Sequence, residues 1–429
     1  MKPAFPVSWL VAACLMTGSL GNLAAQTPSA PAAMPPTVDD GSGIFDAGAF
    51  DTGLADGKTA DTAAKVEWLA GLSLVSDGSF SWIPDEPANA ALIHMYGKVF
   101  LKASKADLGA IYASASYDQF LLAGGSSRAF RDYYQVLRPD LATPNLALSE
   151  LHLSFDIGKT LFVRIGSQLL GWGASQIWSP ADFVNQTKDS TAAVDTRSGK
   201  SGIRLHLPLE GGNIFVFANF SETIQKGVIQ SDALMRVSYA LRADATLLGF
   251  NLGALAAAGP LAPLRLGATL SGSVLGIDLW GEFGSQLEFN GFPFNLGFSV
   301  GGEKTFGAEK EWAVRGEYFH QTNGHGDQSI SASDLASGSF KSLYWGYDYL
   351  YLEVADSKLI GTLLGASLGG KMNLSDLSYQ IAGSLQFTIP NFIPFSATLR
   401  YNGGAAGREF TQPAGRQYWS GQLIAIINW

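Results

Sequence analysis

The stretch LHLSFDIGKTLFVRI, residues 151–165, has the pattern of two short strands joined by a tight turn at Gly158-Lys159. Every second residue is apolar on both sides of that turn: Leu151, Leu153 and Phe155 before it, and Leu161, Val163 and Ile165 after it. A period of two predicts strands with one apolar and one polar face. The apolar face packs on a second sheet in a soluble sandwich, whereas it faces lipid in a membrane barrel.

The same alternation recurs along most of the chain and predicts an all-β fold, a transmembrane antiparallel β-barrel of about 18 strands, with 16–18 compatible with the pattern. The expected strands are 66–76, 91–103, 108–121, 148–157, 160–169, 201–208, 212–221, 232–241, 245–257, 263–272, 274–283, 294–303, 310–320, 347–356, 358–368, 375–388, 392–402 and 417–429. The long connections 122–147, 170–200, 321–346 and 403–416 all follow odd-numbered strands. Outer-membrane barrels place short turns in the periplasm and long loops outside, so the outer membrane is the expected location.

Composition excludes several other classes of protein. Mean hydropathy is +0.12 and only 15% of the 429 residues are charged, yet no run of about 20 apolar residues follows the N-terminus, as a helical membrane protein would require. A soluble all-β enzyme shares this composition and stays open on composition alone. The net charge of −9 argues against nucleic-acid binding, which needs a basic surface.

The N-terminus has the pattern of a secretory signal over residues 1–25, with a basic start at Lys2 and an apolar core. Cys14, the only cysteine, also fits a lipoprotein processing site, so lipidation stays open as an alternative. Residues 26–64 are rich in Ala, Pro, Thr, Gly and Asp and are expected to form a flexible periplasmic segment. The barrel is expected over residues 65–429.

The end of the chain is a separate indication. Alternate residues of the last strand share one face: Trp419, Gly421, Leu423, Ala425, Ile427 and the terminal Trp429. This resembles the C-terminal signal of bacterial outer-membrane proteins, which the barrel-assembly machinery binds by strand augmentation. The resemblance implies that Gly421, Leu423, Ile427 and Trp429 form an assembly signal.

Residues 164–185, RIGSQLLGWGASQIWSPADFVN, resemble a motif of porin-like outer-membrane barrels, in which a strand ends in Gly-Arg/Ser-Gln before Trp-Gly and Trp-x-Pro-x-Asp-x-x-Asn. The segment opens the third external loop, which in general porins folds into the pore and narrows it. The resemblance implies a pore loop with candidate residues Trp172, Trp178, Asp182 and Asn185. The alternative is a packed surface loop with aromatics at the membrane boundary.

Charged residues on the polar faces divide into two groups. The basic candidates for the lumen are Arg164, Arg204, Arg236 and Arg265, and the acidic candidates include Asp278, Glu282 and Glu317. Opposed arcs of charge would set a transverse field across the water column. The alternative is that lumen residues are polar simply because water is there. Tyr347, Tyr349 and Tyr351 would form a stacking track for sugars if they point inward, or an interfacial girdle if they point outward.

These patterns predict a porin-like channel for passive diffusion of small hydrophilic solutes. The alternatives are a non-conducting surface barrel with an adhesion or assembly role through its external loops, a hydrolase at the rim built around His320, and a lipid channel. No catalytic residue, cofactor or metal is predicted, because no histidines except His320 and His325, in one glycine-containing loop, show metal spacing, and catalytic motifs are absent. The expected partners are outer-membrane lipid, the assembly machinery and solutes, and a homo-oligomer is compatible with the sequence.

Overall fold

The computed structural model describes residues 66–83, 90–105, 108–123, 144–185, 197, 199–225, 228–230, 232–288, 291–307, 311–337, 339–361, 363–388, 393–412 and 414–428. The expected signal peptide and the whole expected N-terminal segment, residues 26–64, lie outside these residues.

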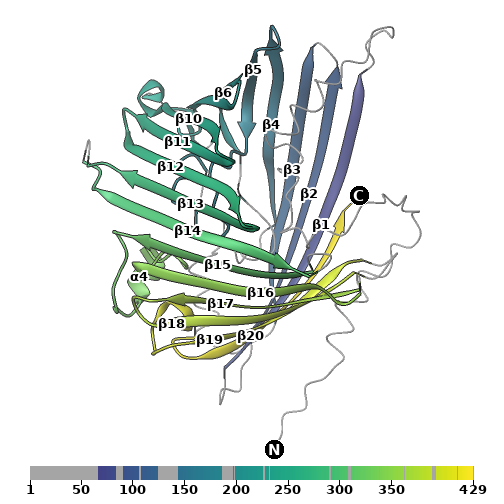
Figure 1. Cartoon of the computed structure of the whole chain (residues 1–429), viewed down its shortest axis with the longest axis vertical. Coiled ribbons are helices and arrows are strands. Elements are labelled where there is room, and N and C mark those ends of the chain that lie inside the picture. Colours follow the sequence, from purple (N-terminus) through teal and green to yellow (C-terminus); the bar gives the residue numbers. More distant parts are fainter. Residues whose placement is uncertain are drawn as a thin grey trace, which may run out of the picture.

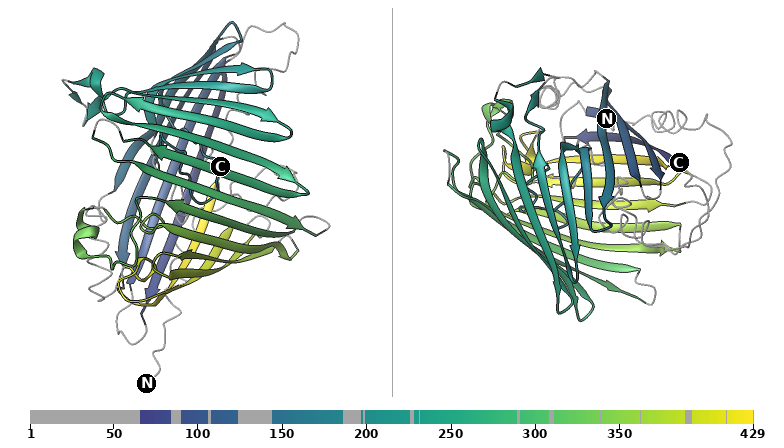
Figure 2. Two further views of the ribbon diagram at one scale, coloured as in Figure 1. Left: turned by 60° about the vertical axis from the view of Figure 1, so that its left-hand side comes forward. Right: turned by 90° about the horizontal axis from the view of Figure 1, so that it is seen from above.

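Eighteen strands form one antiparallel sheet that closes on itself (Figures 1 and 2). The barrel strands are β1 (Glu67–Trp82), β2 (Ala90–Lys105), β3 (Gly109–Ala123), β4 (Asn145–Ile157), β5 (Leu161–Gln168), β6 (Lys200–Leu209), β7 (Gly212–Asn219), β10 (Ser238–Leu247), β11 (Phe250–Gly259), β12 (Ala262–Val274), β13 (Ile277–Gln286), β14 (Asn295–Phe306), β15 (Trp312–Gln321), β16 (Asp348–Ile360), β17 (Leu364–Asn373), β18 (Ser378–Phe387), β19 (Phe395–Gly403) and β20 (Tyr418–Asn428). Each barrel strand pairs with the barrel strand that follows it in this order, so β7 pairs with β10, and β20 pairs with β1. The predicted transmembrane barrel of about 18 strands is confirmed.

The outer face of the barrel is apolar. Outward side chains such as Leu153, Leu352 and Leu368 are 43%, 56% and 62% exposed, whereas inward side chains such as Ser154 and Ser299 are buried. A closed ring leaves no unpaired strand edge, and an apolar exterior suits contact with lipid. The chain therefore has the fold and the surface of an outer-membrane protein.

Small elements occupy the long connections. A hairpin of β8 (Ile224–Gln225) and β9 (Val228–Ile229) and the 3-10 helix η1 (Ala233–Arg236) lie between β7 and β10. Helix α4 (Ala332–Ser337) lies between β15 and β16, and the 3-10 helix η2 (Glu409–Thr411) between β19 and β20. Within the described part of the chain, no helix has the length and apolar character to cross a membrane.

Several strand boundaries were predicted wrongly, among them those of β17, which was expected at 358–368 and lies at Leu364–Asn373, and those of β10. The sequence pattern placed a strand at 232–241 and the next at 245–257, but the structure places β10 at Ser238–Leu247 and β11 at Phe250–Gly259. The hairpin and η1 occupy residues 224–236, so the chain re-enters the barrel later than the alternation suggested. This shift changes which arginine lies on the barrel wall.

The barrel closes between β20 and β1. Gly421, Leu423 and Ile427 lie on one face of β20, and Gln422 on the other face donates from Nε2 to Asp77 Oδ2 of β1 at 2.8 Å. Gly421 lies against the Phe80 ring, which leaves no room for a Cβ at this position. Trp429 lies outside the described residues, so its assembly role stays a prediction.

The long connections lie at one rim, together with the short turns 260–261 and 374–377, because successive antiparallel strands alternate in direction. The short-turn rim carries 158–160, 210–211, 248–249 and 275–276, and the long-loop rim carries 169–199, 220–237, 322–347 and 404–417.

In a chain whose Cys14 is replaced by serine, Ser333→Cys at the long-loop rim is expected to react with an impermeant maleimide on intact cells. Lys159→Cys at the short-turn rim is expected to react only after lysis, and the reverse result would invert the orientation.

Candidate functional site

The loop 169–185 leaves β5 and binds a carboxylate of β13. Glu282, which is 3% exposed, accepts hydrogen bonds from the backbone N–H groups of Ala174 and Ser175 at Oε1 and of Ala181 at Oε2, the last at 3.1 Å. Hydrogen bonds to an ionised acceptor are stronger than neutral ones. This carboxylate therefore fixes both sides of the bend between Ala174 and Ala181.

A second carboxylate binds the tip of the same loop. Glu317 of β15, 2% exposed, accepts from the backbone N–H groups of Gln176 at 3.0 Å and Trp178 at 2.9 Å, and from that of Ile177. The indole Nε1 of Trp280 donates to it at 2.8 Å. Because β8 and β9 are not barrel strands, β15 is the thirteenth of eighteen and lies eight positions from β5. The loop therefore crosses the lumen.

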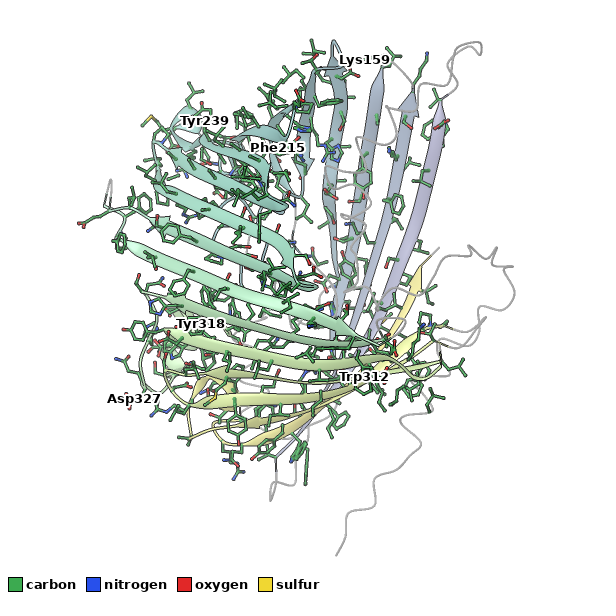
Figure 3. All side chains as sticks on the ribbon, viewed as in Figure 1. Lys159, Phe215, Tyr239, Trp312, Tyr318 and Asp327 are labelled. Atoms are coloured by element: carbon green, nitrogen blue, oxygen red, sulfur yellow. The ribbon has the colours of Figure 1, made fainter. Side chains whose placement is uncertain are left out.

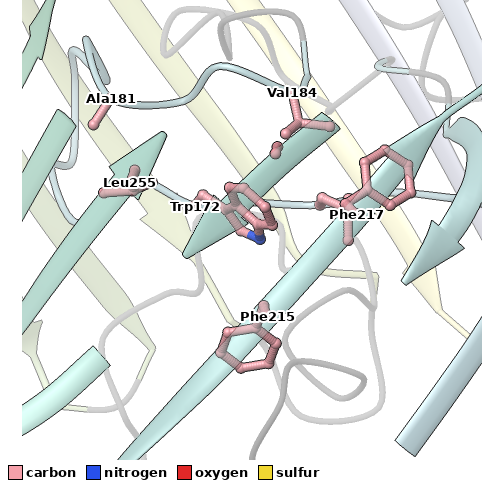
Figure 4. Close-up of a cluster of buried hydrophobic side chains, with 8 residues drawn as sticks. Trp172, Ala181, Val184, Phe215, Phe217 and Leu255 are labelled. Atoms are coloured by element: carbon pink, nitrogen blue, oxygen red, sulfur yellow. The ribbon is translucent and has the colours of Figure 1, made fainter. Parts of the chain in front are cut away.

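Two apolar clusters hold the ends of this crossing. Near β5, the loop residues Leu170, Trp172, Ala181 and Val184 pack with wall residues Phe215, Phe217, Ala240 and Leu255. Figure 4 shows Trp172 between Leu255 and Phe217. A Cβ at Gly284 would meet the carbonyl oxygen of Pro180 at 2.0 Å, so glycine lets the loop lie directly on β13. Trp172, a candidate pore-loop residue, is thus buried and anchors the loop on the wall.

The far end of the crossing lies at Trp178. Its side chain is fully buried, stacks on Phe319 at 5.6 Å between ring centroids, and donates from Nε1 to the carbonyl oxygen of Leu343 at 2.9 Å. Tyr349, Tyr351 and Phe410 complete this cluster. The loop 169–185 is therefore attached to the loops 322–347 and 404–417.

The prediction that the three tyrosines form an exposed stacking track is wrong. Tyr349 is 0% and Tyr351 is 9% exposed, because both point inward and are covered by the Trp178 cluster. Tyr347 lies before β16 and is 37% exposed. These rings support the loop crossing and present no continuous stacking face.

Asp182 and Asn185 fold the loop on itself. The Asp182 carboxylate lies 3.6 Å from Arg197 Nη1 and accepts from the backbone N–H of Asn185 at 3.4 Å, and the Asn185 side-chain amide donates to the carbonyl oxygen of Leu170. Burial raises the pKa of Asp182 to about 7 although Arg197 opposes this shift. Both residues are structural parts of the loop.

The basic wall begins beside the start of the loop. Arg164 of β5 and Arg204 of β6 are cross-strand partners. Arg164 donates from Nε to Ser154 Oγ at 3.2 Å, and Arg204 lies 4.9 Å from the centroid of the Phe215 ring. Arg265 of β12 donates to the carbonyl oxygen of Phe183 at 3.5 Å.

Arg236 does not belong to this wall, which corrects the prediction. It lies in η1 and pairs with Asp232 at 2.7 Å, because the strand begins only at Ser238. The residue that sequence reasoning missed is Arg242 of β10, which donates from Nη1 to the carbonyl oxygen of Trp172 at 2.7 Å. A corrected boundary for β10 would have identified it.

The acidic wall differs from the expectation in one respect. Glu282 and Glu317 are covered by the loop, and their charge is satisfied by its amides, so they are not free lumen charges. Asp278 and Glu303 are cross-strand partners on β13 and β14, and both line a cavity of about 370 Å³. This cavity also contacts Ala174 and Gln176, so it lies directly against the loop.

A third buried carboxylate joins the long loops. Glu409 of η2 accepts from Tyr349 Oη at 2.7 Å, from Asn373 Nδ2 at 2.8 Å and from the backbone N–H of Leu343. Its own backbone N–H donates to Asp376 at 3.0 Å. Burial raises the pKa of Glu409 from 4.5 to about 7.

This shift predicts a pH dependence of loop packing. Because the pKa is higher in the packed loops than in released ones, packing is most stable below about pH 4.5 and loses up to about 3 kcal/mol as pH rises from there through about 7. Glu409→Gln, an uncharged isostere, is expected to flatten this dependence. Protease cleavage of the long loops at pH 5 and pH 8.5 measures it, with Glu210→Gln at an exposed turn as the control. An equal pH dependence in Glu409→Gln would contradict the assignment.

Comparison with known proteins gives a likeness in fold. No family model matches the chain, and no curated protein matches it in sequence. Among solved structures, it resembles Pseudomonas aeruginosa OccK5 (OpdH), with TM-score 0.55, 8% identity, and coverage of 84% of this chain and 98% of that one. It also resembles P. aeruginosa OccK2 (OpdF), with TM-score 0.55, 12% identity, and coverage of 84% and 97%. A BenF-like porin from Pseudomonas fluorescens Pf-5 has TM-score 0.54, 13% identity, and coverage of 85% and 98%. The chain thus has a porin-like outer-membrane barrel fold.

Proposed function

We propose that this porin-like barrel is a channel for passive diffusion of small hydrophilic solutes, with the loop 169–185 as its constriction. The observation that carries the proposal is the attachment of six backbone amides of one loop to Glu282 and Glu317 across the lumen. A loop in this position narrows the water-filled path through the barrel. The two carboxylates hold the loop there.

Charges on the two sides of the crossing support selection by electrostatics. Arg164 and Arg204 lie on β5 and β6, whereas Asp278 and Glu303 lie on β13 and β14 beside the cavity, where Glu303 also pairs with Arg315. Opposed charges produce a transverse field that orients dipolar solutes. No catalytic group or cofactor enters this proposal.

Single-channel recording of the full chain in planar bilayers tests the function. Stepwise conductance in potassium chloride that falls when small sugars are added would support a diffusion channel. A folded, heat-modifiable protein without conductance would favour the non-conducting adhesion barrel instead.

Assembly is the remaining part of the proposal. We expect the barrel-assembly machinery to bind β20, with Gly421, Leu423 and Ile427 on one face and Trp429 at the end. Trp429→Ser is expected to lower the yield of heat-modifiable protein in the outer membrane, with Trp82→Ser, on an outward exposed tryptophan of β1, as the control. Equal yields of the two variants would contradict this role.

A further inference from the structure

Two turns at the short-turn rim have an unusual residue choice. Leu248-Gly249 joins β10 to β11, and Leu275-Gly276 joins β12 to β13. Both residues of each turn have positive φ, 53° and 80° in the first and 52° and 72° in the second. Two-residue hairpin turns with this backbone are type I′.

Leucine is disfavoured at this position when the turn lies in water. Type I′ turns favour Asn-Gly, Asp-Gly or Gly-Gly, because a Cβ in the left-handed region crowds the following carbonyl. The two leucines are also 91% and 90% exposed, more than any other large apolar side chain in the described ranges. Each turn therefore combines an unfavourable backbone position with a fully exposed apolar group.

The surface next to these turns is also apolar. On β12, Leu266, Leu270 and Val274 are 42%, 38% and 40% exposed and lie on the outward face that leads directly to Leu275. On β10, Leu247 is 58% exposed and precedes Leu248. The leucine turns thus continue the lipid-facing surface to the very end of the barrel.

Two other turns at the same rim carry a charged residue. Lys159, also at positive φ, lies in the β4–β5 turn, and Glu210 lies in the β6–β7 turn. Figure 3 shows Lys159 and Trp312 at this rim, away from Tyr239 and Asp327 at the long-loop rim. The difference between the turns lies in the side chain, since all of them connect neighbouring antiparallel strands.

We propose that the leucine turns, Leu248-Gly249 and Leu275-Gly276, are a lipid-binding edge that enters the bilayer leaflet at the short-turn rim, while the Lys159 and Glu210 turns stay in water. The ligand is the acyl-chain and ester region of phospholipid. Continuity with the apolar outer face favours lipid over a protein partner, and immersion explains why an apolar residue stands where water would favour asparagine. The proposal holds whether or not the barrel conducts.

The test places a nitroxide at single cysteines in the full chain with Cys14→Ser, reconstituted in phosphatidylethanolamine–phosphatidylglycerol vesicles. The variants are Leu248→Cys and Leu275→Cys, with Lys159→Cys and Glu210→Cys as matched controls on neighbouring turns. Power saturation compares collisions with oxygen, which concentrates in lipid, and with a nickel chelate, which stays in water. The oxygen-to-nickel ratio is expected above unity at 248 and 275 and below unity at 159 and 210.

A ratio below unity at both leucine turns would overturn the proposal. This result would mean that the leucine turns lie in water when the vesicles hold no other protein. A protein partner would then be the expected ligand of these turns. Heat-modifiability checks that each labelled variant folds. If one turn variant fails to fold, the other leucine turn gives the same comparison.

Discussion

Glu317→Gln is expected to release the tip of the loop 169–185 and to raise single-channel conductance. The carboxylate accepts from three backbone amides and from the Trp280 indole, and glutamine offers one oxygen and turns an NH₂ group toward these donors. The NH₂ group replaces only one of the two acceptor oxygens, so one or two of these donors lose their partner. Each buried donor left unpaired costs about 1–3 kcal/mol, so loop attachment is expected to weaken by at least about 1 kcal/mol. Glu282→Gln is expected to act in the same direction.

The matched control is Glu353→Gln. Glu353 lies on the neighbouring strand β16 and contacts Arg315 at 3.4 Å, without a hydrogen bond to the loop among the described contacts. Planar-bilayer recordings of the three variants should show higher conductance in the first two and no comparable rise in the control. Equal conductance in Glu317→Gln and the parent chain would place the loop outside the permeation path.

The second large effect concerns ion preference. Replacing Arg164 and Arg204 with serine is expected to make the channel more cation-selective, because Asp278, together with Glu303 and its partner Arg315, then faces fewer opposing cations. Two unit charges about 8 Å apart in water interact by about 0.5 kcal/mol. Losing two cations therefore changes the preference by about 1 kcal/mol, roughly fivefold.

Reversal potentials across a potassium chloride gradient measure this change. Arg236→Ser is the control, because Arg236 lies in η1 and pairs with Asp232 away from the barrel wall. A shift in the double variant and none in the control is the expected result. The same reversal potential in all three proteins would mean that the Arg164–Arg204 pair does not face the ions.

Local alternation predicted the fold well, because each strand of a lipid-facing barrel must show its own apolar face. The pattern at 151–165 corresponds closely to β4 and β5, with the turn at Gly158-Lys159. It failed at 232–241, where residues in η1 mimic alternation although they form no strand.

The candidate site was predicted only in part. The motif at 164–185 identified the correct loop, but its partners Glu282 and Glu317 lie more than a hundred residues away, and no local pattern encodes that pairing. The two carboxylates were identified as lumen charges because they lie on polar faces. Their role as acceptors for loop amides depends on where the loop crosses, as does the burial of Trp172 and Tyr349.

The most direct test of the central claim uses a cysteine on the loop itself. The Gln176 backbone binds Glu317, and Gln176 lines the cavity beside Asp278. In a Cys14→Ser background, a charged methanethiosulfonate added to an open Gln176→Cys channel is predicted to lower the current in a single step, whereas Ser333→Cys should show no step. An unchanged current in Gln176→Cys, with labelling confirmed by mass spectrometry, would contradict the claim that this loop constricts the channel.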